Sequence, residues 1–278
     1  MTVLELLQRT TGFFQKNGVE SPRLNAEHLL AHILKRKRIE LYLEFERELT
    51  EAELAPLRDL VRRRGQGEPL QHLLGTVEFA GQTFLCDKRA LVPRPETEQL
   101  VELLKSQVPN SKSQILDVGT GSGVIALSLA AKFPEAKVTG SDVSDAALAL
   151  ARENAERLGL KDRIEFLRGD LLLDVNHVYD LIVANLPYVA AGDRTTLSRE
   201  VLHDPEIALF GGERGDEMIR KFIDEARSHL APGGLLALEI GIGQGEGLAA
   251  LMAEKNYHDI KTERDYAGVI RFLFGRYG

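Results

Sequence analysis

The sequence is poor in the features that mark secreted, membrane-spanning and nucleic-acid-binding proteins. It holds a single cysteine, Cys86, which excludes an intramolecular disulfide framework and a cysteine-rich metal site. No run approaches 18 apolar residues, so we expect no membrane span. The first residues lack the basic start and apolar core of a signal peptide, and we expect a cytoplasmic protein.

A surplus of basic residues is also missing. The 278 residues carry 35 Lys and Arg against 42 Asp and Glu, a formal net charge of −7. The imbalance is uneven, because residues 1–75 hold 12 basic and 11 acidic side chains whereas residues 76–278 hold 23 and 31. Nucleic-acid binders usually show the opposite bias, so we expect no direct contact with nucleic acid. The whole chain has 44% hydrophobic and 28% charged residues, which is the composition of an ordinary globular protein.

The N-terminal part of the chain has the pattern of a small helical domain. Helix-start signatures stand at Thr2 with Glu5, at Ser21 with Pro22, and at Thr50 with Glu53. The second of these opens a segment that runs to about Leu34, and the third precedes a helix that ends in three arginines. No strand pattern interrupts residues 1–70. We therefore assign residues 1–74 to an N-terminal helical domain.

The pattern changes after residue 74. Apolar residues flank Ala80-Gly81-Gln82, which predicts a β-hairpin, and we assign residues 75–92 to a hairpin linker. From residue 93 to 278, short apolar runs alternate with helical stretches such as Ala146–Leu158 and Asp216–Leu230, which predicts an open, mostly parallel α/β sheet. The strands expected are Ile115–Val118, Val138–Gly140, Ile164–Leu167, Leu181–Ala184, Leu235–Ile240 and two closing strands at 259–264 and 269–274, the last of them antiparallel.

A glycine-rich loop follows the first of these strands and opens a helix. Glycines at this position let the backbone turn tightly and approach a ligand, although a tight turn alone is the simpler reading. The dinucleotide fingerprint has its third glycine one place later, where this chain has Val124. The pattern therefore favours a ligand without a pyrophosphate. The candidate ligand-binding residues of the loop are Asp117, Gly119, Thr120, Gly121, Ser122 and Gly123.

Two further acids follow neighbouring strands. Asp142 ends the second strand, where a carboxylate can bind both hydroxyls of a ribose. Together with the loop, this favours S-adenosylmethionine over a nicotinamide cofactor. Asp117 could then face the donor's ammonium group, and Asp170 the adenine amino group; either could instead be a solvated strand-end carboxylate.

The loop Asn185-Leu186-Pro187-Tyr188 follows the fourth strand, at the carboxyl edge where such sheets bind ligands. An amide or aromatic amino nitrogen is a poor nucleophile because its lone pair is delocalised. The side-chain oxygen of Asn185 and the carbonyl of Leu186 can hold its two N–H groups and direct the lone pair at a methyl donor. Pro187 restricts the residue before it to extended conformations, and Tyr188 offers a flat face to a planar group. We name Asn185, Pro187 and Tyr188 as candidate catalytic residues, all four as substrate-binding, and Asn185 as donor-binding too.

These motifs, in this order, resemble those of the HemK/PrmC protein-(glutamine-N5) methyltransferases, and the resemblance covers nearly the whole chain. It also rests on the segments Gly67–Gln71 with Gly75, Leu91–Glu98, Ala208–Gly212 and Leu238–Gly241. Arg94-Pro-Glu-Thr-Glu98 discriminates best, although it could merely cap a helix. Leu186 stands where the family usually has a proline; the resulting Asn-Leu-Pro-Tyr is similar to the loop of rRNA adenine dimethyltransferases, but the carbonyl of residue 186 is retained.

The resemblance implies a class I S-adenosylmethionine-dependent methyltransferase fold with a mostly parallel seven-stranded sheet. It also implies methyl transfer from S-adenosylmethionine to the glutamine of the Gly-Gly-Gln motif in peptide chain release factors. The helical domain would dock the release factor through the basic clusters Lys35–Arg38 or Arg62–Arg64, unless these are solvated faces. We expect a monomer. We also expect no metal, because His28 and His32 share a helix face but lack the glutamate of a zinc-protease helix, and the other histidines show no ligand spacing. The alternatives are an adenine-N6 methyltransferase on RNA or DNA, a nicotinamide oxidoreductase and a non-catalytic interaction module.

Overall fold

The computed structural model describes residues 1–107, 112–173 and 177–278. Its contacts divide the chain into two compact units. We call the first the helical unit, which comprises Met1–Thr76 together with Ser198–His203, and the second the sheet unit, which comprises Val77–Leu197 and Asp204–Gly278. The assignment of residues 198–203 to the helical unit has no signal in the sequence, because it depends on contacts between distant residues.

The helical unit is built from short helices around one apolar core. The helix starts predicted at Thr2 with Glu5 and at Thr50 with Glu53 are present. Thr2 Oγ1 accepts the Glu5 N–H, and in both pairs the glutamate side chain accepts the backbone N–H of the threonine. Ser21 precedes Pro22 at the start of another, without capping it through its side chain. The helices are α1 (Val3–Lys16), α2 (Pro22–Leu34), the 3-10 helix η1 (Arg38–Leu43), α3 (Glu51–Gly65) and α4 (Leu70–Leu74).

Both predicted basic clusters take part in ion pairs, and in the first of them Arg36 pairs with Glu44 and Arg38 with Glu27. Arg62 pairs with Asp59, and Arg63 pairs with Glu68. Arg64 is buried, with 4% of its surface exposed, and donates hydrogen bonds to Asn25 and Glu200. Arg64 is therefore used within the helical unit, because a buried guanidinium requires acceptors for its N–H groups, whereas Arg62 and Arg63 form pairs that are at least partly exposed.

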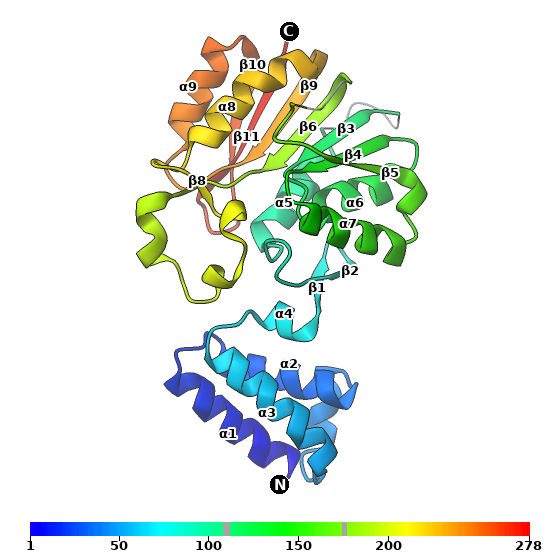
Figure 1. The fold of residues 1–278 in the computed structure, drawn as a ribbon, viewed down its shortest axis with the longest axis vertical. Coiled ribbons are helices and arrows are strands. Elements are labelled where there is room, and N and C mark those ends of the chain that lie inside the picture. Colours follow the sequence, from blue (N-terminus) through cyan, green and yellow to red (C-terminus); the bar gives the residue numbers. More distant parts are fainter. Residues whose placement is uncertain (108–111, 174–176) are drawn as a thin grey trace. The chain divides into compact units, whose positions relative to one another are not determined.

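The sheet unit has the predicted mostly parallel sheet of seven strands, in the order β10-β11-β9-β6-β3-β4-β5 (Figure 1). β11 is antiparallel to both β9 and β10, whereas β9, β6, β3, β4 and β5 pair in parallel. The strand bounds are β3 (Gln114–Val118), β4 (Lys137–Asp142), β5 (Ile164–Arg168), β6 (Tyr179–Asn185), β9 (Leu230–Glu239), β10 (Tyr257–Arg264) and β11 (Ile270–Tyr277).

Helices cover both faces of this sheet. One apolar core contains residues of α5, α6 and the sheet, and a second contains residues of α8, α9 and the sheet (Figure 1). The chain reverses direction along the sheet between β3 and β6, so the ends of these strands and the loops after them form the crevice where such folds bind ligands. The helices are α5 (Pro95–Leu104), α6 (Val124–Lys132), α7 (Asp145–Arg157), α8 (Glu217–Ala226) and α9 (Gly245–Glu254).

Smaller elements complete the sheet unit. The predicted hairpin is present as β1 (Thr76–Phe79) and β2 (Gln82–Leu85), and β7 (Val189–Ala190) pairs in parallel with β8 (Phe210–Gly212). The helical stretch predicted over Asp216–Leu230 divides into α8 and a 3-10 turn. Within the described ranges, no helix has both the length and the apolar character that membrane crossing requires. The predicted boundaries at residues 74 and 92 stay predictions.

Candidate active site

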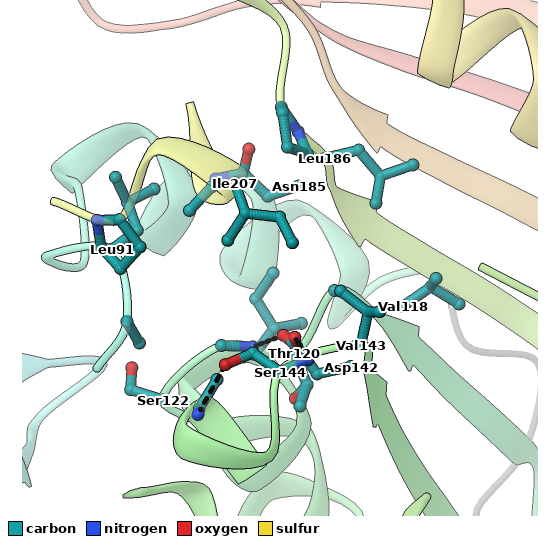
Figure 2. A pocket seen from close by; sticks show the side chains of 18 of the residues that line it. Leu91, Val118, Thr120, Ser122, Asp142, Val143, Ser144, Asn185, Leu186 and Ile207 are labelled. Atoms are coloured by element: carbon teal, nitrogen blue, oxygen red, sulfur yellow. Dashed lines mark hydrogen bonds between the residues drawn. The ribbon is translucent and has the colours of Figure 1, made fainter. Parts of the chain in front are cut away.

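A cavity of about 340 Å³ lies in the sheet unit. This volume is within the range of small-molecule sites. Figure 2 shows Thr120, Asp142 and Ser144 on one side of the cavity, with Asn185 and Ile207 across from them and Leu91 beside them. The loops after β3, β4, β5 and β6 supply polar side chains of the wall, and the segment before α5 supplies further polar and apolar ones. The cavity therefore forms where the carboxyl ends of four parallel strands meet.

The glycine-rich loop forms one wall of the cavity. Gly119, Gly121 and Gly123 all have positive φ angles, of 69°, 57° and 83°, which residues with a Cβ rarely adopt. Gly119, Thr120, Gly121 and Ser122 line the cavity. Gly123 does not line the cavity; it begins α6, and a Cβ there would lie 3.2 Å from the Cβ of Ala151. Gly119 and Gly121 thus present backbone, rather than side chains, to the cavity, and Gly123 allows the close packing of α6 against α7.

Asp117 does not lie at the cavity wall, contrary to the expectation that it faces a ligand. Its side chain is fully buried beneath the loop, where its Oδ2 accepts hydrogen bonds from the Thr120 hydroxyl at 2.6 Å and the Ala126 N–H at 3.1 Å. Burial raises the pKa of this carboxyl to about 7. In this structure Asp117 holds the loop in shape, because it links the end of β3 to the first turn of α6.

Asp142 and Asp170 both line the cavity, as predicted for residues that follow β4 and β5. The Oδ2 of Asp142 accepts the Gly121 N–H at 2.9 Å, and its Oδ1 accepts the Ser144 N–H at 2.8 Å. Burial raises the pKa of Asp142. A carboxylate held by two backbone N–H groups has a fixed orientation, and its remaining lone pairs can bind the two adjacent hydroxyls of a ribose.

The loop after β6 lies across the cavity from the glycine-rich loop. Asn185, Leu186 and Pro187 line the cavity, although the Leu186 side chain also packs into the second apolar core. A Cβ on Gly119 would lie 3.1 Å from the Leu186 Cδ2, so the two loops are in close contact. Tyr188 is not among the cavity-lining residues, contrary to the expectation that its ring faces a planar group; its ring packs against the second core.

Two residues without an assigned role in the sequence analysis hold the Asn185 side chain. Asn185 Nδ2 donates to Thr97 Oγ1 at 2.9 Å, and Thr97 Oγ1 donates to Glu239 Oε2 at 2.7 Å. Thr97 belongs to the Arg94–Glu98 signature, and Glu239 ends β9. Glu239 is the parallel-sheet partner of Asn185, and this register places the carboxylate beside the amide. The feature of the sequence that could have indicated this role is the acidic residue Glu239 at the end of an apolar strand.

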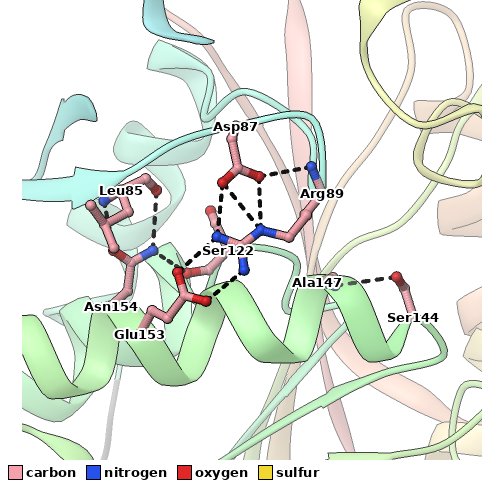
Figure 3. Close-up of polar contacts among 8 residues, drawn as sticks. All are labelled: Leu85, Asp87, Arg89, Ser122, Ser144, Ala147, Glu153 and Asn154. Carbon is pink, nitrogen blue, oxygen red and sulfur yellow. Dashed lines mark hydrogen bonds and ion pairs between the residues drawn. The ribbon is translucent and has the colours of Figure 1, made fainter. Parts of the chain in front are cut away.

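The wall opposite the sheet is held by further polar contacts. Asp204 is buried and accepts hydrogen bonds from the Val92 N–H and the Arg94 guanidinium, which fixes the start of α5. Figure 3 shows Arg89 between Asp87 and Glu153, and the Asn154 amide bonded to the backbone of Leu85 and Ser122. The second of these contacts joins β2, α7 and the glycine-rich loop. These contacts hold the segments around the cavity in fixed positions relative to each other.

A glycine of β8, Gly211, packs tightly against the loop after β6. A Cβ on Gly211 would lie 2.3 Å from the carbonyl oxygens of Pro187 and Gly215. These are backbone atoms, so the clash can be relieved only by a shift of the chain. We expect Gly211→Ala to shift the Pro187 carbonyl and lower kcat by roughly 100-fold, the cost of about 1 Å of misplacement. Steady-state kinetics check this, with Gly192→Ala as the matched control, because a Cβ there meets nothing within 4 Å. Equal activity of both variants contradicts the prediction.

Over the described ranges, no three His, Cys, Asp or Glu side chains gather as a metal site requires. The expectation that the protein uses no metal stays a prediction. The contacts around the cavity instead point to an organic ligand, since they combine backbone N–H groups, one fixed carboxylate and apolar side chains.

The chain resembles known proteins along its whole length. The family models described as PrmC N-terminal domain and Methyltransferase small domain match residues 5–75 and 95–213. A release factor glutamine methyltransferase from Geobacter sulfurreducens is 39% identical over 100% of this chain and 97% of its own length. One from Deinococcus radiodurans is 40% identical over 99% of each.

A solved structure is similar to about two thirds of this chain. The crystal structure of the ribosomal protein L11 methylase from Lactobacillus delbrueckii subsp. bulgaricus is 25% identical, with a TM-score of 0.51, over 66% of this chain and 81% of that chain. The predicted methyltransferase fold is therefore confirmed. The likeness to the two relatives extends through both units at nearly full length, and we conclude that this chain belongs to the release factor glutamine methyltransferase family.

Proposed function

We propose that this protein transfers the methyl group of S-adenosylmethionine to the side-chain amide nitrogen of a glutamine, the one in the Gly-Gly-Gln motif of peptide chain release factors. The relatives' name supports the protein substrate. The observation that carries the chemistry is the position of Asn185, which lies across the cavity from Asp142 and the glycine-rich loop and whose Nδ2 is already bonded to Thr97. Because the NH₂ group of Asn185 faces Thr97, its amide oxygen points away from Thr97, where it can accept a hydrogen bond from a substrate.

The donor fits the wall formed by Gly119–Ser122, Asp142 and Asp170. The Asp142 carboxylate would bind the ribose hydroxyls, and Asp170 would accept from the adenine amino group. The backbone of the loop approaches the rest of the donor closely, because its glycines carry no Cβ. When bound, the sulfonium supplies an electrophilic methyl group. These residues orient that methyl group toward the loop after β6.

The acceptor amide is held by the opposite wall. The Asn185 Oδ1 and the carbonyl of Leu186 would each accept one N–H of the glutamine amide, which directs the nitrogen lone pair at the methyl group. The methyl carbon forms its bond to nitrogen as its bond to sulfur breaks, and sulfur keeps that electron pair. The nitrogen then carries a positive charge and releases a proton to water. A strong base is not needed before transfer, since methylation itself acidifies the nitrogen.

For recognition of the release factor, we favour the cluster Lys35–Arg38 of the helical unit over Arg62–Arg64, because Arg64 is buried. Arg36 and Arg38 of the favoured cluster also form ion pairs, with Glu44 and Glu27. Two exposed apolar side chains follow the cluster, Ile39 and Leu43, and the latter is 85% exposed. Basic and apolar groups side by side suit a protein partner. A release factor is a translation factor, so the proposal also places the enzyme in the cytoplasm. That it acts as a monomer stays a prediction.

Transfer of a labelled methyl group tests the proposed function directly. The purified full-length protein is incubated with methyl-labelled S-adenosylmethionine and a release factor, and the label is located by peptide mass spectrometry. We expect one methyl group on the side-chain amide of the Gly-Gly-Gln glutamine. Replacement of that glutamine by alanine in the release factor should abolish labelling.

Two outcomes contradict the proposal. Label that persists in the alanine-substituted release factor shows that another residue is the acceptor. Label that enters added RNA or DNA instead, with a rate that falls steeply as salt is raised, supports an adenine-N6 methyltransferase, because contacts with phosphates depend strongly on salt.

A further inference from the structure

Four side chains form a hydrogen-bonded chain that runs from the cavity wall, which Asn185 and Thr97 line, to Glu239 and Tyr188 behind it. Asn185 donates to Thr97 at 2.9 Å, Thr97 donates to Glu239 at 2.7 Å, and the Tyr188 hydroxyl donates to the other oxygen of Glu239 at 3.4 Å. Thr97 and Glu239 are nearly fully buried, with 3% and 1% of their surfaces exposed. Water is therefore a poor competitor for these bonds. They join α5, the end of β6 and the end of β9.

The direction of this chain follows from its chemistry. An ionised carboxylate can only accept hydrogen bonds, so the Thr97 hydroxyl donates its single hydrogen to Glu239. The Thr97 oxygen is then left as an acceptor, and it can be paired by the NH₂ group of Asn185 but not by the amide oxygen. We propose that Glu239, acting through Thr97, sets the orientation of the Asn185 amide so that its oxygen faces the acceptor nitrogen. This inference rests on the proposed function.

The inference assigns positioning roles to Thr97 and Glu239, because both would act through the Asn185 amide. An asparagine amide is nearly symmetrical in shape, so sterics alone distinguish its two orientations poorly. In the wrong orientation, Asn185 presents an NH₂ group to the N–H of the substrate, and two donors face each other. The buried carboxylate excludes the wrong orientation, because it requires Thr97 to donate to Glu239 and therefore Asn185 to donate to Thr97.

The charges around Glu239 make the arrangement sensitive to pH. The groups that face it are Thr97 and Glu96 from α5, Tyr188 from the loop after β6 and Arg271 from β11. The hydrogen bond from Thr97 and the positive charge of Arg271 lower the pKa of Glu239. Burial has the larger effect and raises this pKa to about 7. Once protonated, Glu239 can donate to Thr97, which then donates to the oxygen of Asn185. The productive orientation is thus held above the pKa of Glu239 and lost as the pH falls below it.

Replacement of Glu239 by glutamine should allow the chain to reverse at any pH. When Tyr188 donates to the oxygen of the introduced glutamine, its NH₂ group faces Thr97, an arrangement that an ionised carboxylate excludes. Thr97 must then donate its proton to Asn185, which favours the amide oxygen on the wrong side. We expect Glu239→Gln to lower kcat by roughly 10- to 100-fold, the typical effect of one misdirected buried hydrogen bond, with the Kd for S-adenosylmethionine within about threefold of wild type.

A compensating substitution tests direction rather than mere contact. In Asn185→Asp, two carboxylates compete for the single proton of Thr97, and we expect a loss of kcat of roughly 100-fold or more. In the double variant Asn185→Asp with Glu239→Gln, the introduced glutamine donates to Thr97 and Thr97 donates to the introduced aspartate, which leaves a carboxylate oxygen facing the substrate. We expect kcat to recover at least about 10-fold over Asn185→Asp, and the fall in kcat near pH 7 expected of the wild type to be absent.

Thr97 supplies the control for folding. Thr97→Ser keeps the hydroxyl and should retain most of kcat, whereas Thr97→Val removes it and should match Glu239→Gln. Binding of S-adenosylmethionine by calorimetry and thermal unfolding show that each variant is folded. Wild-type kcat in Glu239→Gln and Thr97→Val, or a double variant no better than Asn185→Asp, overturns the positioning role. Failure of the wild-type protein to methylate the release-factor glutamine overturns the proposed function instead.

Discussion

Asn185→Ala should lower kcat by roughly 1,000-fold while the Kd for S-adenosylmethionine changes by less than about threefold. The substitution removes the side-chain oxygen that holds the acceptor amide, and loss of one such preorganised group typically costs about 100- to 1,000-fold in kcat. The upper end applies here, because the Leu186 carbonyl alone cannot fix the direction of the nitrogen lone pair. Single-turnover methylation of a release factor measures the step directly.

The same variant distinguishes a catalytic role from a structural one. Asn185 bonds to Thr97 and adjoins the core through Leu186, so its loss could also loosen the sheet edge. Calorimetric titration with S-adenosylmethionine and thermal unfolding separate the two effects. Donor binding that falls in parallel with turnover indicates a folding defect. Turnover within about threefold of wild type refutes the catalytic role of Asn185.

Asp142→Ala should act on the opposite side of the cavity and raise the Kd for S-adenosylmethionine by about 100-fold or more. The carboxylate would bind two ribose hydroxyls through charge-assisted hydrogen bonds, each worth about 1.5–3 kcal/mol. It also holds the N–H groups of Gly121 and Ser144, so the glycine-rich loop loses a support. At saturating donor, kcat should return to within about tenfold of wild type. The variant therefore affects mainly binding, whereas Asn185→Ala affects mainly turnover.

Asp145→Ala is the matched control for this prediction. Asp145 begins α7, shortly after Asp142, but its side chain is 73% exposed and is not among the cavity-lining residues. Removal of its charge tests whether the general negative potential at this edge attracts the cationic donor. Equal losses of affinity in Asp142→Ala and Asp145→Ala contradict a specific ribose contact.

The sequence predicts the strands, their order of appearance and the loops that carry the site, because these depend on local patterns. Apolar runs between helices mark β3, β4, β5, β6 and β9, and the loops after parallel strands meet at one edge. Thus Gly121, Asp142, Asp170 and Asn185 are found around one cavity. Their sequence positions suffice, since each lies at the end of a strand or in the loop that follows it.

The direction in which a side chain points is harder to predict from sequence. Asp117 and Tyr188 belong to the predicted motifs, yet the first lies beneath the glycine-rich loop and the second packs against a core. Asp117 lies in β3 and Tyr188 directly precedes β7, and successive side chains of an extended backbone point to opposite sides, so membership of a motif does not decide whether a side chain faces the cavity or the interior. The importance of Glu239 depends on its register with Asn185 across two strands that are far apart in the chain. No local pattern in the sequence contains that register.

The membership of residues 198–203 in the helical unit bears on how this enzyme can be divided and recombined. The chain leaves the helical unit after Thr76, re-enters it at Ser198 and leaves again after His203. A fragment that stops at residue 76 lacks Glu200, the acceptor for buried Arg64. An exchange of partner specificity between relatives therefore requires two grafts rather than one, with the arginine and the glutamate transferred together. Recombination at a single junction separates a buried charge from its partner.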